Sequence, residues 1–235
     1  MIEGKKILAV IPARGGSKRL PRKNILNFLD KPLIAWTIQA ALDSKYIDRV
    51  IVSTDDKEIA SISKRYGADV PFMRTSKLAT DESTSIDVVL HLISQLTKNS
   101  EMYDYVILLQ PTSPLRTVKN IDNSIELLQN NKYEAVISVC KTEHSPQWCN
   151  TLPIDGDLSN FLDRSILNKR SQELEQYYRL NGAIYLCNID RLRQEKTFFF
   201  RTKCKAYIMS RKSSVDIDTV DDLIIANCYM STSAT

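Results

Sequence analysis

The 235-residue chain has few of the residues that build the commonest metal and disulfide sites. It has only two histidines, His91 and His144, so a histidine-rich metal site or a charge-relay triad has little to draw on. Its five cysteines are scattered and include no C-x-x-C pair, which argues against structural zinc and against a disulfide framework. We expect these cysteines to be small, buried hydrophobic residues.

Long apolar runs are also missing. No run approaches the roughly 20 residues that a membrane helix needs, and the N-terminus has no signal-peptide pattern. The formal net charge of +4 is modest and concentrated near the N-terminus, which favours a local anion site over a surface that coats nucleic acid. We therefore expect a cytoplasmic protein that binds neither membranes nor nucleic acid and forms a single domain over residues 1–235.

Acidic residues are absent between Gly4 and Leu29. An apolar run over 7–11 opens this stretch and breaks at Pro12, and two of the six glycines, Gly15 and Gly16, follow side by side. Glycine lets backbone N–H groups approach an anion closely. Five cations fall in the same loop: Arg14, Lys18, Arg19, Arg22 and Lys23. A strand, a glycine turn and these cations predict a polyphosphate site.

Neither of the two best-known phosphate loops is present. The spacing fits neither the Walker motif G-x-x-x-x-G-K-[ST] nor the dinucleotide fingerprint G-x-G-x-x-G. The alternative is a solvated basic loop, or one that contacts nucleic acid without specificity. Stacking aromatic side chains, which single-stranded nucleic acid would require, are scarce near the loop.

Strand and helix patterns alternate along the chain. Strands are predicted at 7–11, 49–53, 69–73, 105–109, 135–139, 183–187 and 204–209, with helices between them and a final helix over 220–230. This order predicts an α/β fold with a mostly parallel sheet and helices on both faces. The polar, irregular segment 141–178 is predicted to be a protruding insertion, used as a lid or a subunit contact. The last five residues, 231–235, are expected to fray.

Polar residues follow several of these strands. Because ligands bind beyond the carboxyl ends of parallel strands, we expect these residues to converge on one rim. They are Arg14, Asp55, Arg74 and Gln110.

Two carboxylates, Asp216 and Asp218, flank one apolar residue near the C-terminus. In an extended segment both project to the same side, where they suit a hard cation such as Mg²⁺. The alternative is that Asp218 caps the final helix while Asp216 is solvated. Upstream, Arg179 and Asn181 precede a strand and are candidates for binding a carboxylate and hydroxyls, or else belong to an exposed turn.

Five segments together resemble the N-acylneuraminate cytidylyltransferases, the CMP-sialic acid synthetases, over residues 7–226. They are IPARGGSKRLPRKN, RTSKLATDESTS, LLQPTSPLR, YRLNGAIY and SVDIDT. Enzymes that activate legionaminic or pseudaminic acid share most of these motifs, and the enzyme for 3-deoxy-octulosonic acid is a more distant relative. The resemblance implies a Rossmann-like nucleotide-diphospho-sugar transferase fold, usually dimeric. It also implies a Mg²⁺-dependent reaction of CTP with a nonulosonic acid that gives a CMP-sugar and pyrophosphate.

The resemblance also implies a set of site residues. The nucleotide would be bound by Ala13, Arg14, Gly15, Ser17, Lys23, Asn24, Arg74, Ser83, Thr84 and Ser85. The sugar would be bound by Gln110, Arg170, Arg179 and Asn181. Asp216 and Asp218 match the metal-binding aspartates, and together with Arg14 and Lys23 they form the predicted catalytic set.

One segment departs from the family pattern. Many members carry Arg-Gln-x-Leu-Pro before the YR-x-NG motif, whereas here Ser171 occupies the arginine position and Glu175 the proline position. Either Arg170 takes over the role of that arginine or the sugar site differs. Two other functions stay open at this stage: a nucleotidyltransferase for another sugar acid or nucleotide, and a nucleotide-binding regulatory protein without turnover. A pure binder would not need Lys23, Asp216 and Asp218 together.

Overall fold

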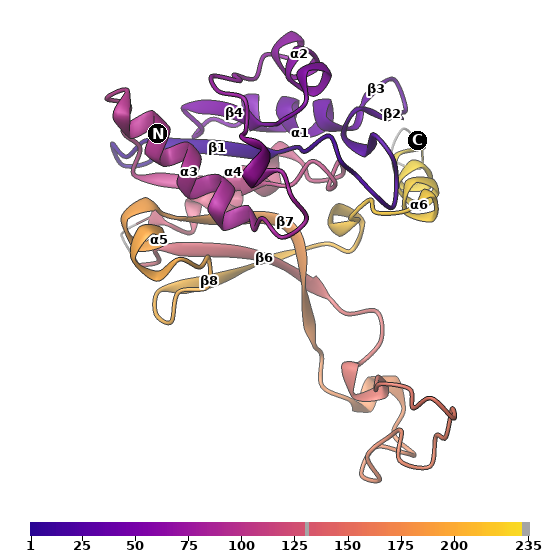
Figure 1. The fold of residues 1–235 in the computed structure, drawn as a ribbon. Helices are drawn as coiled ribbons and strands as arrows, with labels where there is room; N and C mark the ends of the chain where they lie inside the picture. Colours follow the sequence, from indigo (N-terminus) through magenta and orange to yellow (C-terminus); the bar gives the residue numbers. More distant parts are fainter. Residues whose placement is uncertain (130–131, 232–235) are drawn as a thin grey trace.

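In a computed structural model, which describes residues 1–129 and 132–231, the chain forms a six-stranded sheet flanked by helices (Figure 1). The strand order is β4-β1-β5-β7-β6-β8. These strands are β1 (Ile7–Pro12), β4 (Arg49–Ser53), β5 (Tyr105–Leu109), β6 (Ala135–Lys141), β7 (Tyr178–Asn188) and β8 (Cys204–Met209). The predicted strands at 7–11, 49–53, 105–109, 135–139 and 204–209 are confirmed.

Strand β7 runs antiparallel to both of its neighbours, whereas the pairs β1–β4, β1–β5 and β6–β8 are parallel. The sheet is therefore mixed but mostly parallel. The beginning of β7 consequently lies at the same rim as the carboxyl ends of the other strands. Strand β7 is longer than predicted because its first residues, Tyr178 and Arg179, pair with Lys141 and Cys140 of β6. The register of this pair shifts beside Gly182, whose φ of +72° favours glycine.

Helices cover both faces of the sheet. One apolar cluster joins α1 (Leu33–Leu42), α2 (Lys57–Arg65) and α4 (Val118–Glu126) to one face, and a second joins α3 (Ser85–Lys98) and α5 (Ile189–Glu195) to the other. Alternate residues of β1 divide between the clusters, as the alternation of side chains along a strand requires. A third, smaller cluster packs α6 (Val220–Ser231) against the N-terminal loop at the rim.

The predicted strand over Asp69–Met73 is wrong. This segment forms only isolated bridges, from Asp69 to Ile51 of β4 and from Met73 to Thr54, the residue after β4. Pro71 lies between the two bridges and has no N–H to donate, which interrupts the ladder. A two-stranded hairpin, β2 (Asn27–Phe28) with β3 (Lys31–Pro32), was not predicted and forms at the far end of the basic loop.

The segment 141–178 extends from the rim as an arm between β6 and β7 (Figure 1). It is irregular apart from two short 3-10 turns, Pro146–Trp148 and Ser171–Glu173. Of the residues expected to fray, Ser231 ends α6, and 232–235 lie outside the described residues. None of the described helices combines the length and the apolar character needed to cross a bilayer.

Candidate active site

Three adjoining pockets follow the rim where β1, β4 and β5 end. The Lys23 pocket (about 360 Å³) is lined by the basic loop, Gln110 and Asp218. The Arg74 pocket (about 250 Å³) shares Arg14 and Gln110 with it. The Arg179 pocket (about 510 Å³) shares Arg19 and Asp218 with it. Shared walls make the three pockets one elongated cleft, and the predicted convergence of polar residues at one rim is confirmed.

The five cations of the basic loop are all paired by acids from distant parts of the chain. Asp218 accepts from Lys23 Nζ and from Arg19 Nη1, both at 2.7 Å. Asp81 accepts from Arg14 Nη1 at 2.6 Å and also pairs with Lys18. The remaining cation, Arg22, pairs with the two acids Asp56 and Glu58. The loop has no acidic residues of its own, but in the folded chain acidic residues from other segments pair with its cations.

Asp81 therefore sits against two of the predicted phosphate ligands. Ion pairing with Lys18, and then with Arg14, lowers the pKa of the Asp81 carboxyl below its usual value. Asp81 lines both the Lys23 and the Arg74 pockets. The cleft therefore carries a carboxylate between these two cations.

The start of the basic loop is fixed by backbone contacts. Ala13 N donates to Ser53 O at 2.9 Å, Gly15 N donates to Asp55 Oδ1 at 3.1 Å, and Asn24 Nδ2 donates to Arg14 O at 3.0 Å. A Cβ on Gly15 would lie 2.8 Å from Asp56 Oδ2, so only glycine fits there without a shift. Ala13 and Gly15 line none of the three pockets and support the loop, whereas Ser17 and Asn24 line the Lys23 pocket.

Three of the predicted nucleotide-binding residues, Arg74, Ser83 and Ser85, line the Arg74 pocket. Arg74 Nε donates to Ser53 Oγ at 3.2 Å, and burial lowers the pKa of Arg74, with Asp55 opposing that effect. Thr84 forms the N-cap of α3 in a capping box with Asp87. The cap fixes the neighbouring serines at the pocket wall.

Asp216 and Asp218 lie on either side of Ile217, which is fully buried. Asp216 lines the Arg179 pocket, and Asp218 lies where that pocket meets the Lys23 pocket. Partial burial raises the pKa of Asp216, the nearby Thr112 hydroxyl opposes this, and the nearby charge of Asp218 adds to the rise. The alternative that Asp218 caps the last helix is wrong. Instead, Asp222 accepts from the backbone N–H groups of Asp218 and Thr219.

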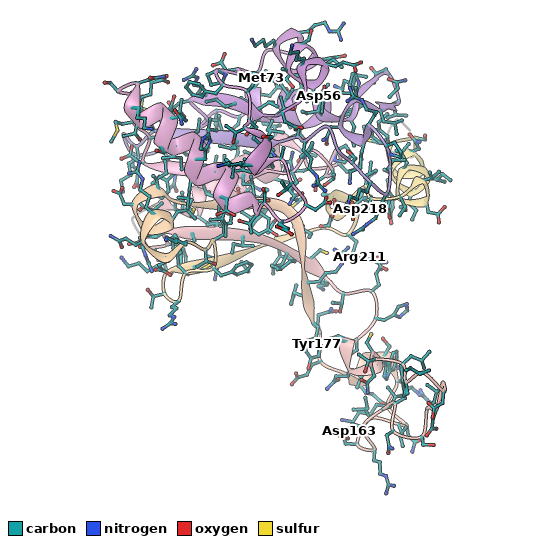
Figure 2. All side chains as sticks on the ribbon, in the orientation of Figure 1. Asp56, Met73, Asp163, Tyr177, Arg211 and Asp218 are labelled. Carbon is teal, nitrogen blue, oxygen red and sulfur yellow. The ribbon has the colours of Figure 1, made fainter. Side chains whose placement is uncertain are left out.

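Two predicted sugar-binding residues lie elsewhere. Asn181 is buried, and its amide donates to Ser214 Oγ at 2.8 Å and accepts from Ser138 Oγ at 2.6 Å. Its amide is thus engaged inside the sheet, whereas Arg179 and Gln110 line the cleft. Arg170 is exposed on the arm and lines none of the three pockets of the described chain. Figure 2 shows how far the arm, marked by Asp163, extends from Asp218 at the rim.

Sequence reasoning missed several residues of the cleft. Asp81 falls inside one of the diagnostic motifs, which was its only signal. Arg211 pairs with Glu143 at 2.8 Å, and both line the Arg179 pocket beside Asp216. This pair joins residues that follow β8 and β6, so only the folded sheet brings it together.

Comparison with known proteins fits this geometry. A family model described as cytidylyltransferase matches residues 8–226. The chain belongs to the cytidylyltransferase family. It is 39% identical over 231 residues to the CMP-N,N'-diacetyllegionaminic acid synthase of Legionella pneumophila, and the match covers 96% of each chain.

Other members of the family differ in the acid that they are named for. The N-acylneuraminate cytidylyltransferase of Escherichia coli is 41% identical over 223 residues, which cover 94% of this chain and 51% of that protein. The pseudaminic acid cytidylyltransferase of Campylobacter jejuni is 36% identical over 221 residues, covering 94% of each.

Solved structures confirm the expected nucleotide-diphospho-sugar transferase fold. A CMP:2-keto-3-deoxy-manno-octonic acid synthetase complexed with CTP aligns with a TM-score of 0.71 at 19% identity, covering 97% of this chain and 99% of that chain. A 4-diphosphocytidyl-2C-methyl-D-erythritol synthase from Anaerococcus prevotii aligns with a TM-score of 0.68 at 17% identity, covering 98% of both.

The carboxylates of the cleft suit a magnesium ion whose other ligands would be phosphate oxygens of a substrate. Among the described residues, no cluster of three or more His, Cys, Asp or Glu side chains could hold a metal ion alone. Asp216 and Asp218 offer carboxylate oxygens, which Mg²⁺ prefers; burial raises the pKa of Asp216, and repulsion from Asp218 adds to the rise. A divalent cation would relieve that repulsion, so the two residues fit the group.

Proposed function

We propose that this chain transfers CMP from CTP to the anomeric hydroxyl of a nonulosonic acid, releasing pyrophosphate. The observation that carries the proposal is the meeting of the basic loop and the two aspartates across one cleft, through the Lys23–Asp218 contact of 2.7 Å. The family match and the names of the relatives support the reaction class.

In this proposal the nucleotide lies along the cleft from the Arg74 pocket to the Lys23 pocket. Arg74, Ser83 and Ser85 would contact the base and ribose. Arg14 and Lys23 would bind the triphosphate and stabilise the charge that develops on the α-phosphate and on the departing pyrophosphate. To do so, both cations would exchange a carboxylate for a phosphate oxygen, Arg14 leaving Asp81 and Lys23 leaving Asp218.

Asp216 and Asp218 would hold Mg²⁺ together with the phosphates, and the ion would supply Lewis-acid charge stabilisation there. The chain itself contributes mainly positioning, since phosphoryl transfer needs little covalent work from the protein. Gln110 and Arg179 lie on either side of the aspartates in the cleft, and we propose that they orient the acid so that its hydroxyl faces the α-phosphorus.

The acid belongs to the sialic, legionaminic or pseudaminic type. Identities of 36% to 41% to enzymes named for all three do not favour one of them. The Arg179 pocket has a mixed lining, which includes arginines, four acidic residues and the apolar surfaces of Ile225 and Tyr229. Such a lining suits an acid that carries both a carboxylate and apolar substituents.

We also propose that the chain is a homodimer and that the arm carries Arg170 to the sugar site of the partner subunit. The arm leaves the sheet at the rim and exposes Leu152, Ile154 and Leu158. Light scattering should give twice the chain mass, and Arg170→Ala should raise the KM for the acid without changing the KM for CTP. A monomer with full activity would overturn this part of the proposal.

The reaction itself is tested by pyrophosphate release. The purified chain is incubated with Mg²⁺, each of the four nucleoside triphosphates, and a panel of nine-carbon and eight-carbon sugar acids. We expect release only with CTP and a nine-carbon acid, with the CMP-sugar identified by mass spectrometry. Release with another triphosphate instead of CTP, or with an eight-carbon acid and no nine-carbon acid, would show that the proposed substrates are wrong. Binding of CTP without turnover on any acid would favour a regulatory protein.

A further inference from the structure

Arg116 is a fully buried arginine directly behind the cleft. It ends the loop that follows β5 and is one of the largest side chains wholly removed from solvent. None of the ion pairs that the structure describes includes it. Burial lowers the pKa of Arg116 to about 9. A buried cation without a carboxylate is costly, and apolar side chains fill a core at lower cost.

The guanidinium instead binds neutral oxygens from three elements. Nη1 donates to Gln110 O at 3.1 Å and to Ala183 O at 2.8 Å, and Nη2 donates to Thr37 Oγ1 at 2.7 Å. Thr37 Oγ1 also donates to Gln110 O, at 3.4 Å. One planar group thus joins the end of β5, strand β7 and helix α1.

One of these oxygens belongs to a residue that lines the cleft, and another belongs to the residue after Gly182, which lies close to the cleft residue Asp216. Gln110 lines both the Lys23 and the Arg74 pockets. Ala183 follows Gly182, where an added Cβ would lie 3.8 Å from Asp216 Oδ2. The loop after β5, which Arg116 ends, also holds the segment of the two aspartates, because Ile217 N donates to Thr112 O at 2.8 Å.

We propose that Arg116 is a positioning residue that fixes the spacing between the Gln110 wall and the Gly182–Asp216 wall. It touches neither substrate. It sets the relative orientation of the acid and the nucleotide, and therefore kcat. The cations that hold the triphosphate do not depend on Arg116 for their positions. This inference rests on the proposed function for its kinetic readout.

The test compares Arg116→Met, Arg116→Lys and Thr37→Val with the wild type. Each protein is assayed for thermal unfolding, for the Kd of CTP by calorimetry, and for kcat and KM at a temperature where it is folded. Leu192→Ala, in the core beneath α5 and away from the cleft, is the control for lost stability alone.

We expect Arg116→Met to lower kcat about 100-fold, the cost of a misplacement of about 1 Å, with the Kd of CTP little changed. Arg116→Lys keeps one donor and should recover about tenfold of that loss. Gln110→Ala should have a much smaller effect in the Arg116→Met background than in the wild type, because the two residues act through one wall. Leu192→Ala should lower the melting temperature and leave kcat unchanged.

A folded Arg116→Met protein with the wild-type kcat would overturn the proposal, as would additive effects of Gln110→Ala and Arg116→Met. If Arg116→Met does not fold, Thr37→Val is judged by the same two criteria. If the wild type transfers CMP to no acid, the proposed function fails separately. In that case amide hydrogen exchange tests the role of Arg116. The amides of 110–116 and of Ala183 should exchange faster in Thr37→Val than in the wild type, and the amides of α2 should not. Unchanged exchange at 110–116 and Ala183 would overturn the role of Arg116.

Discussion

Lys23 Nζ lies 2.7 Å from Asp218 Oδ1, so a cation near the start of the chain meets a carboxylate 195 residues later. The contact joins the loop after β1 to the segment that precedes α6. Arg19 reaches the same carboxylate. The two halves of the proposed chemistry, cations for phosphate and carboxylates for metal, are therefore adjacent in the folded chain.

The first prediction concerns Asp216. Asp216→Asn should lower Mg²⁺-dependent turnover by several orders of magnitude with the fold intact, because a neutral amide is a poor ligand for Mg²⁺. The measurement is pyrophosphate release during a Mg²⁺ titration, together with calorimetric binding of Mg²⁺ and CTP. Asp221→Asn removes the same charge at an exposed position in the first turn of α6 and is the matched control. A normal Mg²⁺-dependent rate in Asp216→Asn would refute the metal role.

The second prediction compares two adjacent glycines. Gly15→Ala places a Cβ 2.8 Å from Asp56 Oδ2, whereas a Cβ on Gly16 meets nothing within 4 Å. Asp56 cannot easily give way, since it caps α2 and pairs with Arg22. We expect Gly15→Ala to cost about 1–3 kcal/mol of unfolding free energy and to raise the KM for CTP. Gly16→Ala should match the wild type in urea unfolding and in kinetics, and equal behaviour of the two variants would contradict the packing argument.

The third prediction concerns Asp81, which occupies Arg14 and Lys18. Asp81→Asn should free both cations and tighten the binding of CTP and of pyrophosphate about threefold at low salt, an effect that salt should weaken. Isothermal titration at two salt concentrations measures it. The exposed neighbour Glu82→Gln is the control. Weaker binding of CTP by Asp81→Asn would show that Asp81 takes part in the complex instead of competing with the phosphates.

The fourth prediction concerns acid stability through Asp56. Its side chain accepts from Glu58 N and Ile59 N at 2.9 Å, and its pKa is lowered by the hydrogen bond from Arg22, against the opposing effect of burial. A carboxyl whose pKa is lower in the folded state stabilises the protein above its unfolded pKa of about 4, and this stabilisation is lost as the pH falls through the folded pKa. Asp56→Ala should cost about 1–2 kcal/mol at neutral pH.

The control for that prediction is Asp56→Asn, which keeps a good N-cap but loses the charge that faces Arg22. It should cost less than Asp56→Ala at neutral pH. The difference between wild type and Asp56→Asn should shrink as the pH falls below about 4, because the unfolded chain then takes up a proton, and it should level off once the pH is below the lower pKa of the folded carboxyl. Urea unfolding at neutral and acidic pH measures both effects, and a difference that does not depend on pH would contradict the ionic contribution.

Much of the rim was predictable because its signals are local. Apolar runs such as Tyr105–Leu109 identify buried strands, and the polar residues that follow them meet at one edge of a parallel sheet. The Asp69–Met73 segment reads as a strand from its composition, but its backbone has too few donors to extend the ladder. The direction of β7 could not be deduced either, since it is revealed by antiparallel pairing with β5 and β6, which are distant in sequence from most of β7.

The charges of the cleft were less predictable. The basic loop lacks acids along the sequence, yet Asp81 and Asp218 neutralise four of its cations in space. Arg116 appears in sequence as one more exposed cation at the end of a motif, and only its burial against Gln110 and Ala183 reveals a supporting role. Pairing between residues far apart in the chain depends on the tertiary fold, which local patterns do not encode.

The buried position of Ile217 links the far end of the chain to the proposed chemistry. This isoleucine packs in one small cluster with Leu20, Phe28 and Ala226, so the two aspartates beside it are held by the docking of the last helix. A carboxyl-terminal deletion or fusion that disturbs this helix should therefore weaken the proposed binding of Mg²⁺, although neither aspartate has been removed. Helix α6 thus helps to fix the positions of Asp216 and Asp218.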